Sequence, residues 1–214
     1  MEKIGNIFFT SDTHFHHKNI VRGTSEWLLE ENKGPTSFER TRDFNTLEEH
    51  DEVIINSINA VVKENDTLYH LGDWSFGGHE QIKIFRDRIN CKNIHLIFGN
   101  HDQHITPINS PYRQLFTSCD YYKELNLKID CQKSGKYGKQ MICLSHYAMR
   151  VWNKSHKGSI MLYGHSHGTL PEFGKSMDVG VDTNNLYPYH LDEILEIMKN
   201  RSTIIVDHHN ITTN

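Results

Sequence analysis

The sequence predicts an α/β protein in which short strands alternate with helices and form a largely parallel sheet. Three features indicate this: apolar runs of strand length, helix-like apolar spacing between them, and glycine or polar residues where the runs stop. Such alternation is typical of right-handed β-α-β units. The run at residues 93–98 shows the pattern best, because it is rich in Ile, Leu and Phe and stops at Gly99, as a buried strand does.

The first half of the chain carries the clearest elements. Its apolar patterns predict strands at residues 6–10, 67–71 and 93–98 and helices at 47–62 and 82–89. Thr46 and Glu49 form a capping-box pattern at the start of the first helix. The charged segment 21–42 contains two glycines, so we expect a long loop with a short helical piece near residues 26–31.

The second half is less regular but predicts further strands. Alternating apolar residues at 125–129 and 140–144 indicate a hairpin around the polar turn 134–139. Later elements are expected as strands at 159–163, 177–181 and 203–206 and a helix at 191–198. Since no repeat or linker interrupts the chain, we expect residues 1–214 to form a single domain.

Composition restricts the partners and the compartment. The net charge of −4 gives no general attraction to nucleic acid or acidic membranes, so we expect no extended nucleic-acid binding. No apolar stretch approaches the roughly 18 residues that span a bilayer. Without an apolar leader or a C-x-x-C pair, a cytoplasmic protein with free thiols is expected, although Cys131 and Cys143 can also face each other across the hairpin.

Polar side chains of metal-binding type follow five of the predicted strands. They are Asp12 and His14, Asp73, Asn100 with His101 and Asp102, His146, and His165 with His167. In open α/β sheets ligands bind outside the carboxyl ends of strands, so we expect these side chains to converge. One D-x-H pair alone is typical of a polar loop. Its repetition at strand ends, in a chain with 16 histidines, favours a centre for two divalent ions.

In the order and spacing of these residues the chain resembles the calcineurin-like metallophosphoesterase superfamily. The five blocks are Asp12-x-His14, Gly72-Asp73, Gly99-Asn100-His101-Asp102, His146 and Gly164-His165-x-His167. Together they cover most of the chain and are far more specific than any single motif. The resemblance implies an αββα fold, a two-sheet β-sandwich flanked by helices. The segments 15–20 and 155–159 resemble those of small bacterial and phage-type members.

The resemblance also implies a dinuclear centre. It assigns the first ion to Asp12, His14, Asp73 and His167, and the second to Asp73, which bridges, with Asn100, His146 and His165. This set of nitrogen and oxygen ligands suits Mn²⁺, the first candidate, and also Fe, Ni²⁺, Co²⁺ or Zn²⁺.

Two neighbouring ions compensate phosphate charge and acidify a water molecule. We therefore expect a hydroxide that bridges both ions to attack phosphorus in line with the leaving oxygen. His101 lies beside the ligand Asn100 and has no metal assigned to it, so it is the candidate acid that protonates the leaving group. Asp102 is its expected orienting partner.

The residues after Asp73 restrict the substrate. Protein phosphatases of the superfamily place Asp and Arg-Gly just after the Gly-Asp block, whereas here Trp74, Ser75 and Phe76 follow. The missing arginine favours phosphodiesters of small or nucleotide-like substrates. Two alternatives stay open: a phosphomonoesterase, including a protein phosphatase, and a metal-stabilised binding module without turnover. The oligomeric state is not predicted.

Further residues are candidates for substrate contact. His16 and His17 flank the first ligands, Arg22 and His156 lie on charged loops, and Trp74 can stack on a base. Each has a plainer interpretation, because loop histidines and cations are usually solvated and an aromatic residue after a buried strand usually belongs to the core.

Overall fold

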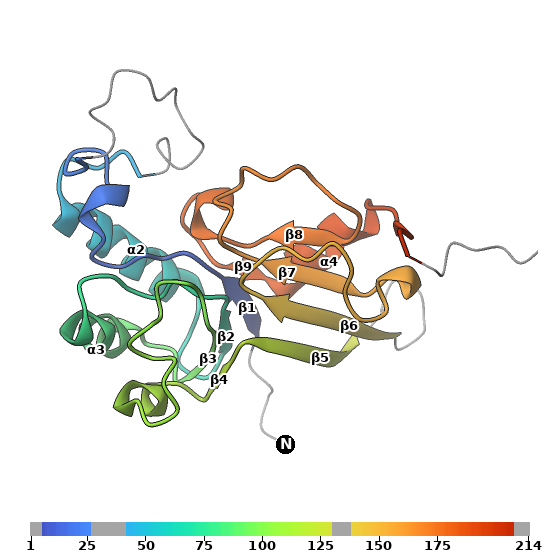
Figure 1. The fold of residues 1–214 in the computed structure, drawn as a ribbon, viewed down its shortest axis with the longest axis horizontal. Coiled ribbons are helices and arrows are strands. Elements are labelled where there is room, and N and C mark those ends of the chain that lie inside the picture. Colours follow the sequence, from blue (N-terminus) through green and yellow to red (C-terminus); the bar gives the residue numbers. More distant parts are fainter. Residues whose placement is uncertain (1–5, 27–41, 130–137, 208–214) are drawn as a thin grey trace, which may run out of the picture.

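Two β-sheets form the centre of the molecule, as the computed structural model shows for residues 6–26, 42–129 and 138–207 (Figure 1). The first sheet has the order β4 (Ser118–Asp120), β3 (Asn93–Ile97), β2 (Thr67–His70), β1 (Ile7–Thr10) and β9 (Tyr189–His190). The second has the order β5 (Tyr122–Ile129), β6 (Gly138–Ser145), β7 (Ile160–Tyr163) and β8 (Ser176–Asp178).

The helices of the described residues connect or flank these strands. The α-helices are α2 (Leu47–Val61), α3 (His79–Arg88) and α4 (Leu191–Lys199). Short 3-10 helices are η1 (Lys18–Ile20), η2 (Pro111–Leu115), η3 (Ser155–Lys157) and η4 (Val181–Thr183). The predicted α/β architecture with two sheets flanked by helices is therefore confirmed.

Strands β1, β2, β3 and β4 of the first sheet run parallel, and β9 is antiparallel to β1. In the register, Leu68 lies between Phe8 and Ile94. In the second sheet, β5 and β6 form the predicted hairpin, and β7 and β8 add to β6 in parallel. Because parallel strands end at the same edge of a sheet, β1, β2 and β3 deliver their following residues together, as do β6 and β7.

The two edges meet through main-chain contacts just beyond β1. Ser11 forms a parallel bridge with Gly180, which follows β8, and the Val181 N–H donates to the Ser11 carbonyl over 3.1 Å. Within the first sheet, the Asp12 N–H donates to the Gly72 carbonyl over 3.0 Å. These contacts bring the carboxyl end of the second sheet against that of the first.

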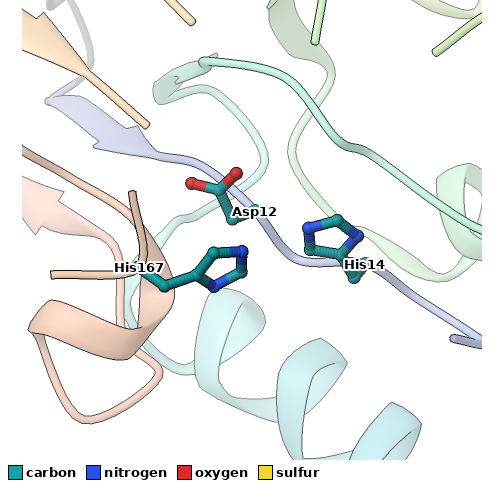
Figure 2. Close-up of side chains that lie close together, drawn as sticks. All are labelled: Asp12, His14 and His167. Carbon is teal, nitrogen blue, oxygen red and sulfur yellow. The ribbon is translucent and has the colours of Figure 1, made fainter. Parts of the chain in front are cut away.

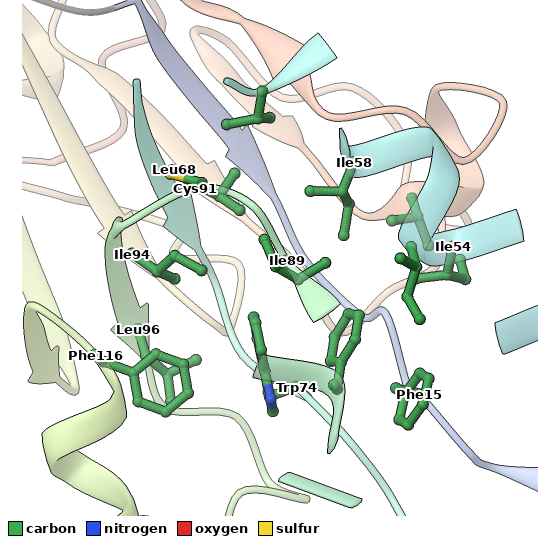
Figure 3. Close-up of a cluster of buried hydrophobic side chains, with 14 of the residues drawn as sticks. Phe15, Ile54, Ile58, Leu68, Trp74, Ile89, Cys91, Ile94, Leu96 and Phe116 are labelled. Carbon is green, nitrogen blue, oxygen red and sulfur yellow. The ribbon is translucent and has the colours of Figure 1, made fainter. Parts of the chain in front are cut away.

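Helices α2 and α3 pack on the outer face of the first sheet, where we call the buried side chains the outer core. Figure 3 shows part of this cluster, which includes Phe15, Ile54, Ile58, Leu68, Trp74, Ile94 and Leu96. Apolar residues spaced four apart on α2, such as Ile54 and Ile58, give the helix one apolar face. Both side chains are fully buried, so this packing holds α2 on the sheet.

The opposite faces of both sheets enclose an inner core. Phe9 and Tyr69 alternate with the outer-core residues on their strands, because successive side chains of a strand point to opposite faces. Leu144 and Leu162 of the second sheet pack into the same cluster, as does Ile194 of α4. The two sheets are therefore held together by apolar burial, while the polar residues that follow their strands lie at the carboxyl ends of those strands.

Some sequence expectations fail or lie outside the described residues. The predicted strand at 203–206 is wrong, because these residues are not assigned to a strand, and the short strands β4 and β9 were not predicted. The helical piece near 26–31 falls largely outside the described residues, as do the hairpin turn and Cys131. Cys91, Cys119 and Cys143 are free.

No helix among the described residues has the length and apolar character needed to cross a membrane.

Thr46→Ala tests the predicted helix start. The Thr46 hydroxyl accepts from the Glu49 N–H over 3.1 Å within a complete capping box. Its loss leaves a helix N–H without this acceptor, so the free energy of unfolding is expected to fall by about 1 kcal/mol, measured by urea denaturation. Thr117→Ala, at an exposed position outside a helix, is the control; an equal loss there would refute the capping role.

Candidate metal centre

The candidate ligands lie just beyond the carboxyl ends of five strands. Asp12 and His14 follow β1, Asp73 follows β2, Asn100 follows β3, His146 follows β6, and His165 and His167 follow β7. Five of these seven residues have left-handed backbones, with φ of 55° at Asp12, 44° at His14, 56° at Asp73, 66° at His165 and 47° at His167. Such conformations cost about 1–3 kcal/mol each and cluster at functional sites.

One group of potential ligands joins the two sheets. The ligand atoms of Asp12, His14 and His167 all lie within 4.8 Å of one another, and Figure 2 shows the three side chains facing a common space. The rings of His14 and His167 are 5.3 Å apart and nearly parallel. Both ring nitrogens of His14 are buried and have no hydrogen-bond partner among the described residues, which leaves them suited to a metal.

A second group lies on the other side of Asp73. The ligand atoms of Asp73, His146 and His165 again lie within 4.8 Å of one another. Asn100 joins them, because its Oδ1 is 3.0 Å from His146 Nε2 and 2.9 Å from His165 Nδ1. His146 Nδ1 lies 2.7 Å from the Leu71 carbonyl, so this contact orients Nε2 toward the group.

Asp73 stands between the two groups. Its Oδ2 is 3.4 Å from His14 Nε2 and 3.6 Å from His146 Nε2, while its Oδ1 accepts the His101 N–H over 2.8 Å. A Cβ atom at Gly99 would collide with this carboxylate, so the glycine is required by close packing. One oxygen of Asp73 therefore faces both groups.

The electrostatics of these side chains fit a divalent cation. Burial raises the pKa of Asp12 to about 8 and raises the pKa of Asp73 above its ordinary value. Burial also lowers the pKa of His14 well below its usual range and that of His146 to about 4. Buried carboxylates need a compensating cation, and neutral imidazoles are the form that binds a metal. The residues present are therefore suitable ligands.

His101 and Asp102 take different positions. His101 forms a third group with His14 and Asp73, whose potential ligand atoms also lie within 4.8 Å of one another. The Asp102 carboxylate instead accepts three main-chain N–H groups, from Gly99 over 2.7 Å and from Asp73 and Trp74 over 3.0 Å each. It thus joins the turns after β2 and β3, and this arrangement differs from the expected orienting bond to the His101 ring.

Of the candidate substrate residues, His17 lies beside the centre. Its ring is stacked on Phe76 with 3.9 Å between centroids and is 5.4 Å from the ring of His14. The side chain of His16 is partly exposed, and its Nδ1 lies 3.0 Å from Asp51 Oδ2. His17 is therefore part of the wall of the site, whereas His16 is anchored toward α2.

Of three other candidates, Trp74 is in a position that contradicts substrate contact, whereas Arg22 and His156 stay predictions. Trp74 is fully buried in the outer core, where its Nε1 donates to the Ile82 carbonyl over 3.3 Å, so it cannot stack on a base. Arg22 pairs with Asp43 over 3.1 Å, and both are exposed. His156 lies in η3 before β7, whereas the candidate ligands follow that strand.

Sequence reasoning missed Arg42, Asp178 and Asp182. Asp182 Oδ2 lies 2.7 Å from His167 Nδ1, and Asp178 accepts the Gly168 N–H over 2.9 Å. Burial raises the pKa of Asp182, but the charge of Arg42 and hydrogen bonds from His167 and Arg42 hold it below its ordinary value. Asp178 lies within the strand predicted at 177–181 and Asp182 follows it directly, and a carboxylate just after a predicted strand is the signal that would have found Asp182.

Comparisons with known proteins address the family and the fold. The profile of the calcineurin-like phosphoesterases matches residues 5–213. An uncharacterised protein of Methanocaldococcus jannaschii, MJ1445, is 25% identical over 202 residues, which cover 90% of this chain and 91% of that protein. The crystal structure of AQ665 from Aquifex aeolicus, a protein of unknown function, matches with a TM-score of 0.56 at 22% identity. The match covers 90% of this chain and 99% of that chain, so the two proteins have a common fold. Because the family profile spans nearly its whole length, the chain belongs to the calcineurin-like phosphoesterase family.

Proposed function

We propose that this metal-dependent phosphoesterase hydrolyses phosphodiesters of small or nucleotide-like substrates with two divalent cations, Mn²⁺ being the first candidate. One cation is held by Asp12, His14, Asp73 and His167, and the other by Asp73, Asn100, His146 and His165. The observation that carries the proposal is Asp73 Oδ2, at 3.4 Å and 3.6 Å from two imidazole nitrogens. A carboxylate oxygen between two sets of donors is what a shared ligand requires.

When bound, the cations supply charge compensation for the phosphate oxygens and make a water molecule more acidic. In this proposal the side chains of the protein hold the cations in place and protonate the leaving oxygen. Burial keeps His14 and His146 neutral, so their ring nitrogens can act as ligands. The imidazole of His101 is partly buried, 5.3 Å from the ring of His14, and in this proposal it gives a proton to the leaving oxygen.

Two features favour a diester over a monoester. The residue after Asp73 is Trp74, which is buried and offers no cation to a phosphate. The Arg42 guanidinium is directed to Asp182 and to main-chain carbonyls. A phosphate monoester carries a charge of about −1.5 to −2 at neutral pH, whereas a diester carries one negative charge and requires less positive charge from the protein.

A pair of chromogenic substrates tests this proposal. With Mn²⁺ added, we expect faster hydrolysis of bis(p-nitrophenyl) phosphate than of p-nitrophenyl phosphate, measured as kcat/KM from nitrophenol release. The reverse preference would favour a phosphomonoesterase. No turnover of either substrate by folded, metal-loaded protein would favour a binding module.

Asp73→Asn is expected to abolish both metal occupancy and activity. The amide keeps the size of the side chain but removes the charge that faces both groups, so neither cation is held as before. Metal content after gel filtration, measured by mass spectrometry, and hydrolysis rate are the two measurements. Asp87→Asn on α3, whose side chain is exposed, is the matched control. Retention of two ions by Asp73→Asn would contradict the shared-ligand role.

His101→Ala is expected to keep two bound ions and to slow turnover by about 10² to 10⁴, the usual effect of losing a general acid. A substrate with a better leaving group should lose less, because it needs less protonation. His79→Ala, at an exposed position on α3, serves as the control. Loss of a metal ion from His101→Ala would show instead that His101 is a ligand.

A further inference from the structure

A fully buried arginine lies directly behind the first group of candidate ligands. Arg42 has no exposed surface, and arginine is almost never fully buried unless it is paired. Its Nε and Nη2 atoms each donate to one carboxylate oxygen of Asp182 over 2.9 Å. Nη1 lies 2.8 Å from His50 Nε2. The guanidinium is therefore fixed in a bidentate ion pair inside the protein.

Asp182 connects this ion pair to the metal centre. The Oδ2 atom that accepts from Arg42 also lies 2.7 Å from Nδ1 of His167. A carboxylate on one ring nitrogen of a histidine fixes both its rotation and its tautomer. With Nδ1 engaged in this way, Nε2 is the nitrogen that serves a metal, and Figure 2 shows the ring of His167 turned toward Asp12 and His14.

Arg42 also holds the main chain that carries the other two ligands of this group. Its Nη2 donates to the Asp12 carbonyl over 2.5 Å and its Nη1 to the Thr13 carbonyl over 3.0 Å. Asp12 and His14 both have left-handed backbones, which need support from the surrounding structure. One guanidinium thus contacts the main chain that carries Asp12 and His14 and the carboxylate that orients His167.

The contacts continue from Arg42 to helix α2. His50 Nδ1 lies 3.0 Å from Asp51 Oδ1, and the same carboxylate oxygen accepts the His16 N–H over 2.8 Å. His16 has a left-handed backbone as well. The loop after β1 is therefore anchored at both ends to one buried polar network.

The second group of ligands has a different support. His146 Nδ1 lies against the main-chain carbonyl of Leu71, whereas the Arg42 guanidinium bonds to Asp182, to His50 and to the carbonyls of Asp12 and Thr13. Removing the ion pair should therefore affect one cation and spare the other.

We propose that Arg42 and Asp182 are positioning residues that set the affinity of the cation held by Asp12, His14 and His167. The inference rests on the ligand assignment of the proposed function. Arg42 and Asp182 orient His167 and the loop after β1, and they touch neither substrate nor metal.

The test uses the full chain and Mn²⁺ alone. Arg42→Met combined with Asp182→Asn removes both buried charges together, so that neither is left unpaired inside the protein, which is the most destabilising case. We expect titration calorimetry to show two Mn²⁺ sites in the wild type, and in the double variant one unchanged site and one weakened by about 10- to 100-fold. The Mn²⁺ electron paramagnetic resonance spectrum should change accordingly from that of a coupled pair to that of an isolated ion.

Two further variants separate positioning from general destabilisation. Arg42→Lys keeps the charge but loses the bidentate geometry, so it should also weaken the site formed by Asp12, His14 and His167. Asp66→Asn removes a buried carboxylate that accepts the Asn6 and Lys63 N–H groups at the start of β2, and it should leave both sites unchanged.

The outcomes distinguish the two proposals. Unchanged Mn²⁺ affinity at both sites in the folded double variant would overturn the positioning role, and so would an equal loss of affinity at both sites. If the double variant does not fold, Arg42→Lys, which keeps a charge opposite Asp182, gives the same comparison. Absence of Mn²⁺ binding by the wild type would instead contradict the proposed function.

Discussion

The meeting of strand ends from two sheets is the constraint on which the candidate metal centre depends. Asp12 follows a strand of the first sheet and His165 follows a strand of the second, and the His165 N–H donates to both carboxylate oxygens of Asp12. The bridge between Ser11 and Gly180 fixes the two edges relative to each other. Because a shift of one residue turns every side chain of a strand to the other face, the apolar burial of the two cores also specifies where these ligands point.

Burial creates the chemical character of the centre. Asp12, His14 and Asp73 at the junction of the sheets have little access to water, so burial disfavours the charged form of each. Asp12 is shifted toward its neutral form and His14 is held neutral. A divalent cation reverses the balance for the carboxylate and uses the neutral imidazole. The same burial that makes the centre unfavourable without a cation therefore makes it suitable for one.

The acidic residues around the centre divide into two kinds. Asp12 and Asp73 face the groups of candidate ligands, whereas Asp102, Asp178 and Asp182 hold the loops and rings that carry them. This second kind is needed because left-handed backbones are unfavourable for residues with side chains and persist only when neighbouring groups hold them. Arg42 supports the same loops from the side of α2. The geometry of the centre is thus a property of its supports as much as of its ligands.

The sequence by itself determined the strands after which the candidate ligands occur, the helix that begins at Thr46, and the resemblance to the family, because apolar period, capping pattern and motif order are local or linear properties. Only the tertiary structure decided that Trp74 is buried, that Asp102 binds main-chain N–H groups, and that Arg42 pairs with Asp182. The apolar run at 203–206 formed no strand, since a strand needs an available partner as well as a suitable sequence. Contacts between segments distant in sequence depend on how the two sheets and α2 pack, and no local pattern contains that information.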